Sequence, residues 1–191
     1  MTGPQHGDEA PTNLPDSLAA RPRDPKRQLL PIPPVNLHPD PSTGVLVVDF
    51  TTVNTTTATS LAIDRRCSLC GSVVDYWVGF LGSPRAAELM QYADPPGCPD
   101  CLKAAITLCP HIAVERHRRA RTDRPGAGIL PPGADPDKPP YWVLGITRSY
   151  RSVFVAEHGY TVYLPASFRT VHTFGYGPDG RINPVPTTRQ R

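Results

Sequence analysis

"CSLCG" (residues 67–71) and "GCPDC" (residues 97–101) are two Cys-x-x-Cys pairs separated by 27 residues, in a chain that has five cysteines. Zinc prefers four thiolate or imidazole ligands in a tetrahedron, and each pair can place two sulfurs on one side of a metal ion. One pair alone is weak evidence, whereas two pairs together are a strong indication of a metal site. The sequence therefore predicts structural zinc (Zn2+) with four ligands: Cys67, Cys70, Cys98 and Cys101.

The residues around the pairs indicate how the ligands are presented. Gly71 directly follows Cys70 and can supply the positive φ that a zinc knuckle needs. "GSVVDYWVGFLG" (71–82) is rich in β-branched and aromatic residues and predicts a hairpin or a pair of strands. After the second pair, apolar residues recur at helical spacing, so Cys98 and Cys101 would lie at a helix N-terminus, which favours thiolate. Knuckle, hairpin and helix together describe a treble-clef zinc finger.

Other roles for the cysteines have less support in the sequence. A redox pair would leave the first Cys-x-x-Cys unexplained, and two disulfides require an oxidising compartment. An iron–sulfur centre would use the same four cysteines, and spacing alone does not exclude it. Cys109 follows Cys101 by eight residues, about 12 Å along a continuous helix, which predicts a buried core residue. His111 and His117 are expected to be ordinary polar residues, with a ligand role in place of one cysteine as the alternative.

Composition limits the size of the ordered core. Proline accounts for 25 of 191 residues, and each proline removes a backbone donor. We expect an α+β fold in which a treble-clef-like zinc-binding core is followed by a β-rich C-terminal segment and preceded by a disordered, proline-rich N-terminus. The predicted parts are a disordered tail (1–28), a zinc-binding domain (29–120), a Pro/Gly-rich loop (121–140), a β-rich segment packed on the same domain (141–176) and a flexible tail (177–191).

The N-terminal residues lack the basic and apolar regions of a secretory signal, and no apolar run approaches the roughly 18 residues of a membrane span. These features predict a soluble, cytoplasmic protein without a membrane partner. The reducing cytoplasm in turn favours metal binding over disulfides.

Enzymatic chemistry has little support in the sequence. A zinc deaminase needs His-x-Glu, which occurs nowhere in the chain. Zinc nucleases of the His-Asn-His type need a histidine on the hairpin, and residues 71–94 contain none. Four protein ligands would also leave zinc without an open position. We therefore expect no catalytic residues, and a nuclease- or deaminase-like enzyme is the weakest alternative.

Arginines suggest a binding role. "ERHRRARTDR" (115–124) is arginine-rich, and two further arginines precede the first cysteine pair. If the helix after the second pair continued to Ala120, these residues could form one basic edge for the phosphates of DNA or RNA. The predicted nucleic-acid-binding residues are Arg65, Arg66, Arg116, Arg118, Arg119 and Arg121. The alternatives are an adaptor that binds a protein partner, or a solvated helix end where arginine suits the helix dipole.

Several segments together resemble an uncharacterised family of small Cys-x-x-Cys zinc-finger-like proteins from actinobacteria and their phages. They are "LPIPPVN" (30–36), "VVDFTTV" (47–53), "RRCSLCG" (65–71), "DPPGCPDC" (94–101), "CPHIA" (109–113) and "ITRSY" (146–150). Cys98 stands where this family commonly has a histidine, so the resemblance implies that Cys98 is a ligand. It also implies a particular role for Cys109-Pro110 and a phage origin, but no activity.

Overall fold

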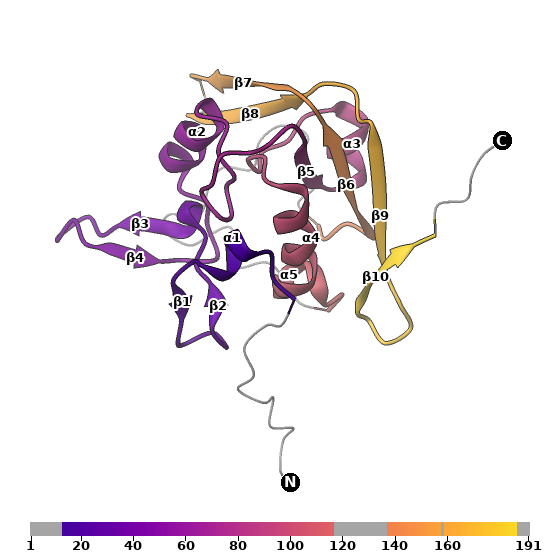
Figure 1. Ribbon diagram of the computed structural model, residues 1–191, viewed down its shortest axis with the longest axis horizontal. Helices are drawn as coiled ribbons and strands as arrows, with labels where there is room; N and C mark the ends of the chain where they lie inside the picture. Colours follow the sequence, from indigo (N-terminus) through magenta and orange to yellow (C-terminus); the bar gives the residue numbers. More distant parts are fainter. Residues whose placement is uncertain (1–12, 117–136, 158, 187–191) are drawn as a thin grey trace, which may run out of the picture.

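The computed structural model describes residues 13–116, 137–157 and 159–186, which form a mixed fold of helices and antiparallel sheets (Figure 1). The helices are α1 (Asp16–Ala19), η1 (Pro34–Asn36), α2 (Thr55–Ile63), α3 (Pro84–Leu89), α4 (Pro99–Leu108) and α5 (Pro110–Ala113). The strands are β1 (Arg23–Asp24), β2 (Leu30–Pro31), β3 (Leu37–Pro39), β4 (Leu46–Val48), β5 (Val78–Gly82), β6 (Tyr141–Thr147), β7 (Tyr150–Val155), β8 (Tyr160–Pro165), β9 (Thr170–Tyr176) and β10 (Ile182–Val185). None of the helices in these ranges has the length and apolar character needed to cross a membrane.

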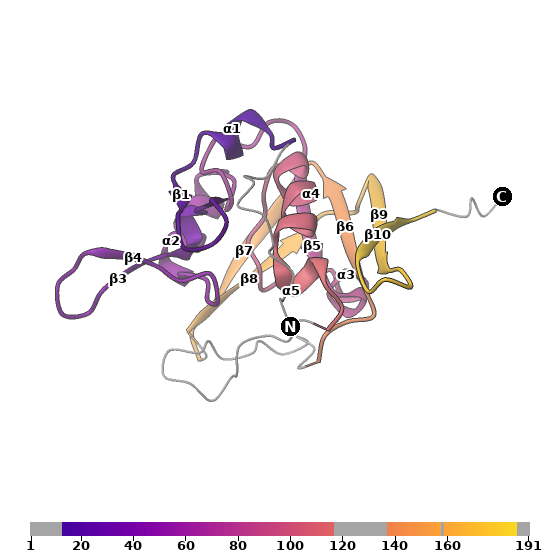
Figure 2. The same cartoon turned by 90° about the horizontal axis from the view of Figure 1, so that it is seen from below.

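An antiparallel sheet with the strand order β10-β9-β6-β5 forms the centre of the described chain. The register places Phe80 of β5 opposite Gly145 of β6. Helix α4 lies against this sheet (Figure 2), where its residues Leu102 and Ile106 pack with Leu144 of β6. β6 is buried over most of its length because it has a strand on each side and packing partners on its faces.

The main buried cluster combines cysteines with apolar side chains from both halves of the chain. Cys67, Cys70 and Cys101 are at most 5% exposed, and they pack in one cluster with Leu18 of α1 and Tyr163 of β8. The rings of Phe80, Tyr92 and Phe168 pack against each other in the same region, in tilted and edge-on arrangements. The metal-ligand candidates therefore lie in the core and not at its edge.

The predicted disordered tail is wrong for residues 13–28. Pro15 precedes α1, and Leu18 of this helix is only 3% exposed. β1 and β2 then pair antiparallel, with Asp24 opposite Leu30. The short, half-polar segment "DSLA" buries its leucine among residues that are distant in the sequence, a contact that local composition does not reveal. Residues 1–12 lie outside the described ranges.

Two predicted strand regions also differ from the structure. Residues 71–82 contain one strand, β5 at Val78–Gly82, and not a hairpin or a pair of strands, because β5 pairs with β6, which is distant in the sequence. The β-branched, apolar residues at 45–53 indicate a strand, but only the three residues of β4 form one, and they are exposed on a projecting hairpin with β3 (Figure 1). The segment at 55–66, whose sequence suits either a strand or a short helix, contains α2, which is capped by the Asn54 side chain, the acceptor of the Thr57 N–H at 3.1 Å.

The helix after the second cysteine pair is shorter than expected. α4 ends at Leu108, Cys109 is extended, and Pro110 opens the one-turn helix α5, as proline at a helix start favours. Beyond Ala113 the chain pairs with the β9–β10 turn, where the Glu115 N–H donates to the Gly180 carbonyl at 2.9 Å. The expected continuation of this helix to Ala120 is therefore wrong at residues 114–116, and residues 117–136 lie outside the described ranges.

The C-terminal residues form most of the sheet structure. β6, β7, β8 and β9 occupy 141–176. The predicted flexible tail at 177–191 is wrong for residues 182–185, because β10 pairs with β9 in antiparallel register. Residues 187–191 lie outside the described ranges.

Candidate metal centre

The first cysteine pair sits in a tight turn. The Gly71 N–H donates to the Cys67 carbonyl, and the Cys67 N–H donates to the Ser72 carbonyl, both at 2.8 Å. Gly71 has φ +78°, a left-handed conformation that glycine adopts without steric cost. Arg66 and Val73 bridge across the base of the turn. This geometry directs Cys67 and Cys70 to the same side, as predicted for a zinc knuckle.

The second pair lies at the start of α4. Cys98 is the N-cap residue, Pro99 takes the first helical position, and Cys101 follows within the first turn. Gly97, just before this pair, exchanges two backbone hydrogen bonds with Gly79 of β5. A Cβ on Gly97 would lie 3.2 Å from Cys67 Sγ, so glycine here allows the second pair to approach the first closely.

The four sulfur atoms of Cys67, Cys70, Cys98 and Cys101 all lie within 4.8 Å of one another. Ligands of a tetrahedral ion with Zn–S bonds of about 2.3 Å are separated by about 3.8 Å. The cluster therefore has the ligand number, the ligand type and nearly the spacing of a four-thiolate metal site. Three of the four side chains are buried, and Cys98 is half-buried.

Hydrogen bonds to sulfur favour the thiolate form. The backbone N–H of Cys98 donates to Cys67 Sγ at 3.2 Å. Contacts between the thiols, led by Cys101, lower the pKa of Cys67 to about 7 and also lower the pKa of Cys70. The pKa values of Cys98 and Cys101 are raised, chiefly by contact with Cys101 and Cys67 respectively. Four thiolates this close repel one another, so full ionisation of the cluster requires a cation.

The N-terminal segment covers one side of the cysteines, which the sequence did not predict. The Ser17 hydroxyl lies 3.7 Å from Cys101 Sγ, and Leu18 packs in the same cluster. A hydroxyl near a metal-bound sulfur can orient it by hydrogen bonding. The short proline-containing stretch around Leu14 and Leu18 gave no local indication of this contact.

Cys109 and His111 lie outside the four-sulfur group. Cys109 is half-buried at the junction of α4 and α5 and not fully buried as predicted, because the chain turns out of the helix at this residue. The His111 ring lies edge-on to Trp142 at 5.8 Å between centroids. His117 lies outside the described residues.

Those predicted basic residues that the structure describes, Arg65, Arg66 and Arg116, do not lie along one edge. Arg65 and Arg66 are exposed at the base of the knuckle, and the Arg65 guanidinium donates to the Arg148 carbonyl at 3.2 Å. Arg116 instead lies beside the turn between β9 and β10. The two places are at opposite ends of the seven-residue strand β9, about 20 Å apart. Arg118, Arg119 and Arg121 lie outside the described residues.

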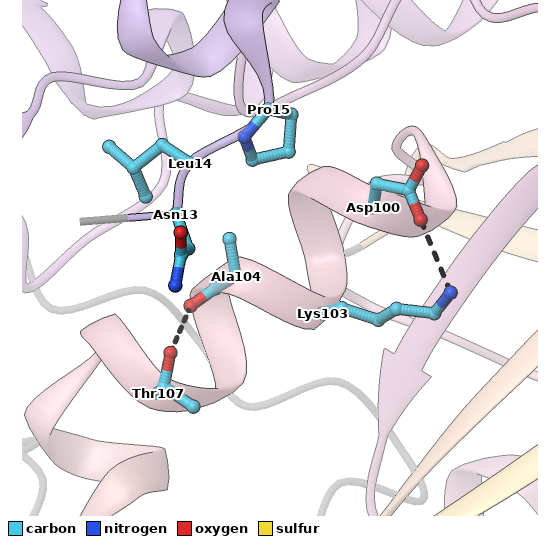
Figure 3. Close-up of a pocket in the computed structure, with 7 residues that line it drawn as sticks. All are labelled: Asn13, Leu14, Pro15, Asp100, Lys103, Ala104 and Thr107. Atoms are coloured by element: carbon cyan, nitrogen blue, oxygen red, sulfur yellow. Dashed lines mark hydrogen bonds and ion pairs between the residues drawn. The ribbon is translucent and has the colours of Figure 1, made fainter. Parts of the chain in front are cut away.

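A hollow of about 660 Å³ separates α4 from Asn13–Pro15 (Figure 3). Its charged side chains, Asp100 and Lys103, pair with each other at 3.2 Å. The Thr107 hydroxyl donates to the Ala104 carbonyl. The polar side chains that α4 contributes to the hollow are thus engaged within that helix.

No family model, curated protein or solved structure matches this chain. The resemblance to the zinc-finger-like family of actinobacteria and their phages therefore stays a prediction.

Proposed function

We propose that the four cysteines hold a structural zinc ion and that the zinc-held core is a non-enzymatic module that binds nucleic acid. The observation that carries this proposal is the group of four sulfurs within 4.8 Å, drawn from two separate elements and packed in the core. Four protein ligands leave zinc no open position for substrate or water, which is the arrangement of structural and not catalytic sites.

The spacing favours a single ion. A cluster of several irons places iron and sulfide atoms between its cysteine ligands, so it needs sulfurs held further apart than 4.8 Å. The hydrogen bond from the Cys98 N–H to Cys67 Sγ also suits a thiolate that is bound to one metal ion. Among single ions with four thiolate ligands, zinc is the common structural choice.

Local geometry supports a treble-clef-like arrangement. A knuckle presents Cys67 and Cys70, and a helix N-terminus presents Cys98 and Cys101. A treble clef usually has a second hairpin strand that leads back to the helix. Here a single β-bridge between Gly79 and Gly97 takes its place, and α3 lies between these two glycines in the sequence. The proposed centre is thus a variant in which β5 completes a larger sheet.

Arginines at the knuckle favour nucleic acid over the alternative of a protein partner. Arg66 directly precedes Cys67, and its guanidinium donates to the Gly71 carbonyl at 3.0 Å. Folding of the metal site thereby places two exposed cationic side chains, Arg65 and Arg66, on its outer surface. A protein-interaction adaptor remains the second candidate because arginine is also common in protein interfaces.

The first test is metal content per chain on protein purified without chelator, combined with circular dichroism before and after a strong chelator. One zinc per chain and loss of structure on its removal are expected, because the binding free energy of a structural metal is folding free energy. Cobalt substitution should give the ligand-field spectrum of tetrahedral thiolate coordination. Iron with visible absorbance, or no metal, contradicts the proposal.

Matched cysteine variants sharpen this test. Cys101→Ser removes a fully buried member of the cluster, and the zinc content should fall well below one per chain. Cys109→Ser changes a cysteine outside the cluster, and one zinc per chain should remain. Equal zinc loss in both variants would show that the metal is held by a different set of ligands.

A further inference from the structure

Aromatic rings and arginines meet on the surface next to the knuckle. The guanidinium of Arg148, the residue after β6, lies 4.8 Å from the ring centroid of Tyr76 and 5.5 Å from that of Trp77. The two rings are edge-on to each other at 4.9 Å. Tyr76 is 53% exposed although it is a large aromatic residue. We call Arg65, Arg66, Tyr76, Trp77 and Arg148 the arginine–aromatic surface.

The backbone holds this surface together. The Val74 N–H donates to the Arg65 carbonyl at 2.8 Å, two residues before Tyr76. The Arg65 guanidinium reaches the Arg148 carbonyl and also lies 5.6 Å from the Tyr150 ring. Segments near residues 65, 76 and 148 are therefore brought to one place, at the end of the sheet where β6 finishes.

Arg65 occupies a backbone conformation that suits a different residue. It follows α2 with φ +51°, and the Arg66 N–H donates back to the Leu61 carbonyl at 2.7 Å. This is the position after a helix where glycine is favoured, because a side chain in the left-handed region is strained. Met90 at the end of α3 has the same φ, so the conformation by itself assigns no role to Arg65, but it makes glycine an unstrained replacement at this position.

The charges on this surface are available to a ligand. Within the described residues, Arg65, Arg66 and Arg148 form no ion pair with a carboxylate. Asp64 and Asp75 adjoin Arg65 and Tyr76 in the sequence and are exposed, and neither of them pairs with these arginines. The guanidinium of Arg148 makes cation–π contacts with both rings, and such contacts do not use its N–H groups, which can bind a phosphate.

We infer that the arginine–aromatic surface binds single-stranded nucleic acid, with the arginines on phosphates and Tyr76 stacked on an unpaired base. This inference rests on the proposed binding function and names its site and ligand class. Exposed rings flanked by cations are the recognition elements for single strands, because the base faces are free to stack only when bases are unpaired. A duplex would offer phosphates to the arginines but no base face to Tyr76.

The test titrates the zinc-loaded full chain with labelled oligodeoxyuridylate, oligouridylate and a duplex of the same length, using fluorescence anisotropy. Single strands should bind at least tenfold more tightly than the duplex. The single strand with the higher affinity shows whether deoxyribose or ribose is preferred. The chain has two tryptophans, and Trp142 is buried, so stacking near the partly exposed Trp77 should quench the intrinsic fluorescence.

Variants separate stacking from charge. Tyr76→Ala should weaken single-strand binding on the order of tenfold, and Arg148→Ala should lower the salt slope of binding by about 0.7. Tyr141→Ala and Arg85→Ala are the matched controls, since Tyr141 is exposed at the opposite end of β6 and Arg85 is exposed on α3. Both controls should bind like the unaltered chain.

Arg65→Gly distinguishes a binding role from a structural one. Glycine suits the left-handed conformation, so the midpoint temperature of thermal unfolding should stay the same or rise. The affinity for single-stranded nucleic acid should fall several-fold. Unchanged affinity in Arg65→Gly and Tyr76→Ala, or equal binding of duplex and single strand, overturns the inference.

Zinc content measured on the same sample separates the two proposals. A chain with one zinc that binds no oligonucleotide overturns this inference, leaves the zinc centre standing and favours the protein-partner alternative. A chain without zinc contradicts the proposed metal centre, while the same titration still decides whether the surface binds single strands.

Discussion

At the scale of single residues, the metal centre depends on glycine as well as on cysteine. Gly71 closes the knuckle with a positive φ, and a Cβ there would lie 3.3 Å from Pro34 Cγ. Gly44, in the turn between β3 and β4, has nearly the same φ of +71° but open space around its Cα. A side chain would therefore be strained by the backbone conformation at both positions, but it would be crowded by a neighbour only at Gly71.

Gly71→Ala and Gly44→Ala should therefore separate backbone strain from damage to the metal site. Each is expected to lower the free energy of unfolding by about 1 kcal/mol, because alanine is strained in the left-handed region. Only Gly71→Ala should also weaken zinc retention against a competing chelator. Urea denaturation and chelator competition measure the two effects, and equal zinc retention in both variants would contradict a special role for Gly71.

The cysteine cluster was the part of the molecule that the sequence predicted best. Cys-x-x-Cys pairs are local patterns, and each one brings its two sulfurs together through a single turn. The positions of Arg148 and Trp77 could not be obtained in this way. They become neighbours only because β5 pairs with β6, a contact between residues about 70 positions apart. Local patterns carry no information about such a pairing.

At the scale of elements, the short helix α1 has an importance that its length does not suggest. It has four residues, yet it buries Leu18 among the cysteines and places the Ser17 hydroxyl near Cys101 Sγ. An isolated helix of this length is not stable in water, so it owes its structure to these contacts.

Leu18→Ala should lower the free energy of unfolding by about 3 kcal/mol, because it leaves a cavity beside the metal centre. The same change should speed the transfer of zinc to a chelator, since α1 shields that side of the cluster. Leu89→Ala is the control, because Leu89 is also in a short helix but is 47% exposed. Thermal unfolding and stopped-flow zinc release would measure both effects, and similar behaviour of the two variants would argue against a covering role for α1.

Element prediction failed where tertiary contacts decide the outcome. β4 has the β-branched composition of a buried strand, but Val47 and Val48 are exposed on the hairpin with β3. Conversely, the segment around Leu18 has the composition of a disordered tail and is held by the core. Helix α4, in contrast, was predicted from the periodicity of its apolar residues. It ends at Leu108, two residues before Pro110, because a proline within a helical pattern interrupts the helix.

At the scale of the whole molecule, the metal centre and the sheet share one core. The cysteines pack in the same cluster as Phe80 of β5 and Tyr163 of β8. Loss of the metal ion or of a cysteine should therefore also destabilise strands that contain no metal ligand. The hairpin of β3 and β4 has exposed side chains along β4 and pairs only with itself in the described part of the chain.

Removal of zinc should raise amide hydrogen exchange in β5 and β6 by at least tenfold, because these strands lose the packing on which their protection depends. Amides of β3 and β4 should change little and serve as the internal control. Hydrogen exchange with mass spectrometry, before and after a chelator, measures both regions in one experiment. Increased exchange confined to residues 65–74 would show that the knuckle is a local unit, independent of the sheet.

The pairing of β5 with β6 also has a consequence during protein synthesis. β5 and all four cysteines emerge from the ribosome before the strand that pairs with β5, since Thr147 at the end of β6 follows Cys101 by 46 residues. At 5 to 20 residues per second this delay is about 2 to 9 s. During that interval the nascent chain exposes one edge of β5 and four thiols. Capture of a metal ion at this stage would protect the thiols from oxidation and hold β5 beside α4 until its partner strand is made.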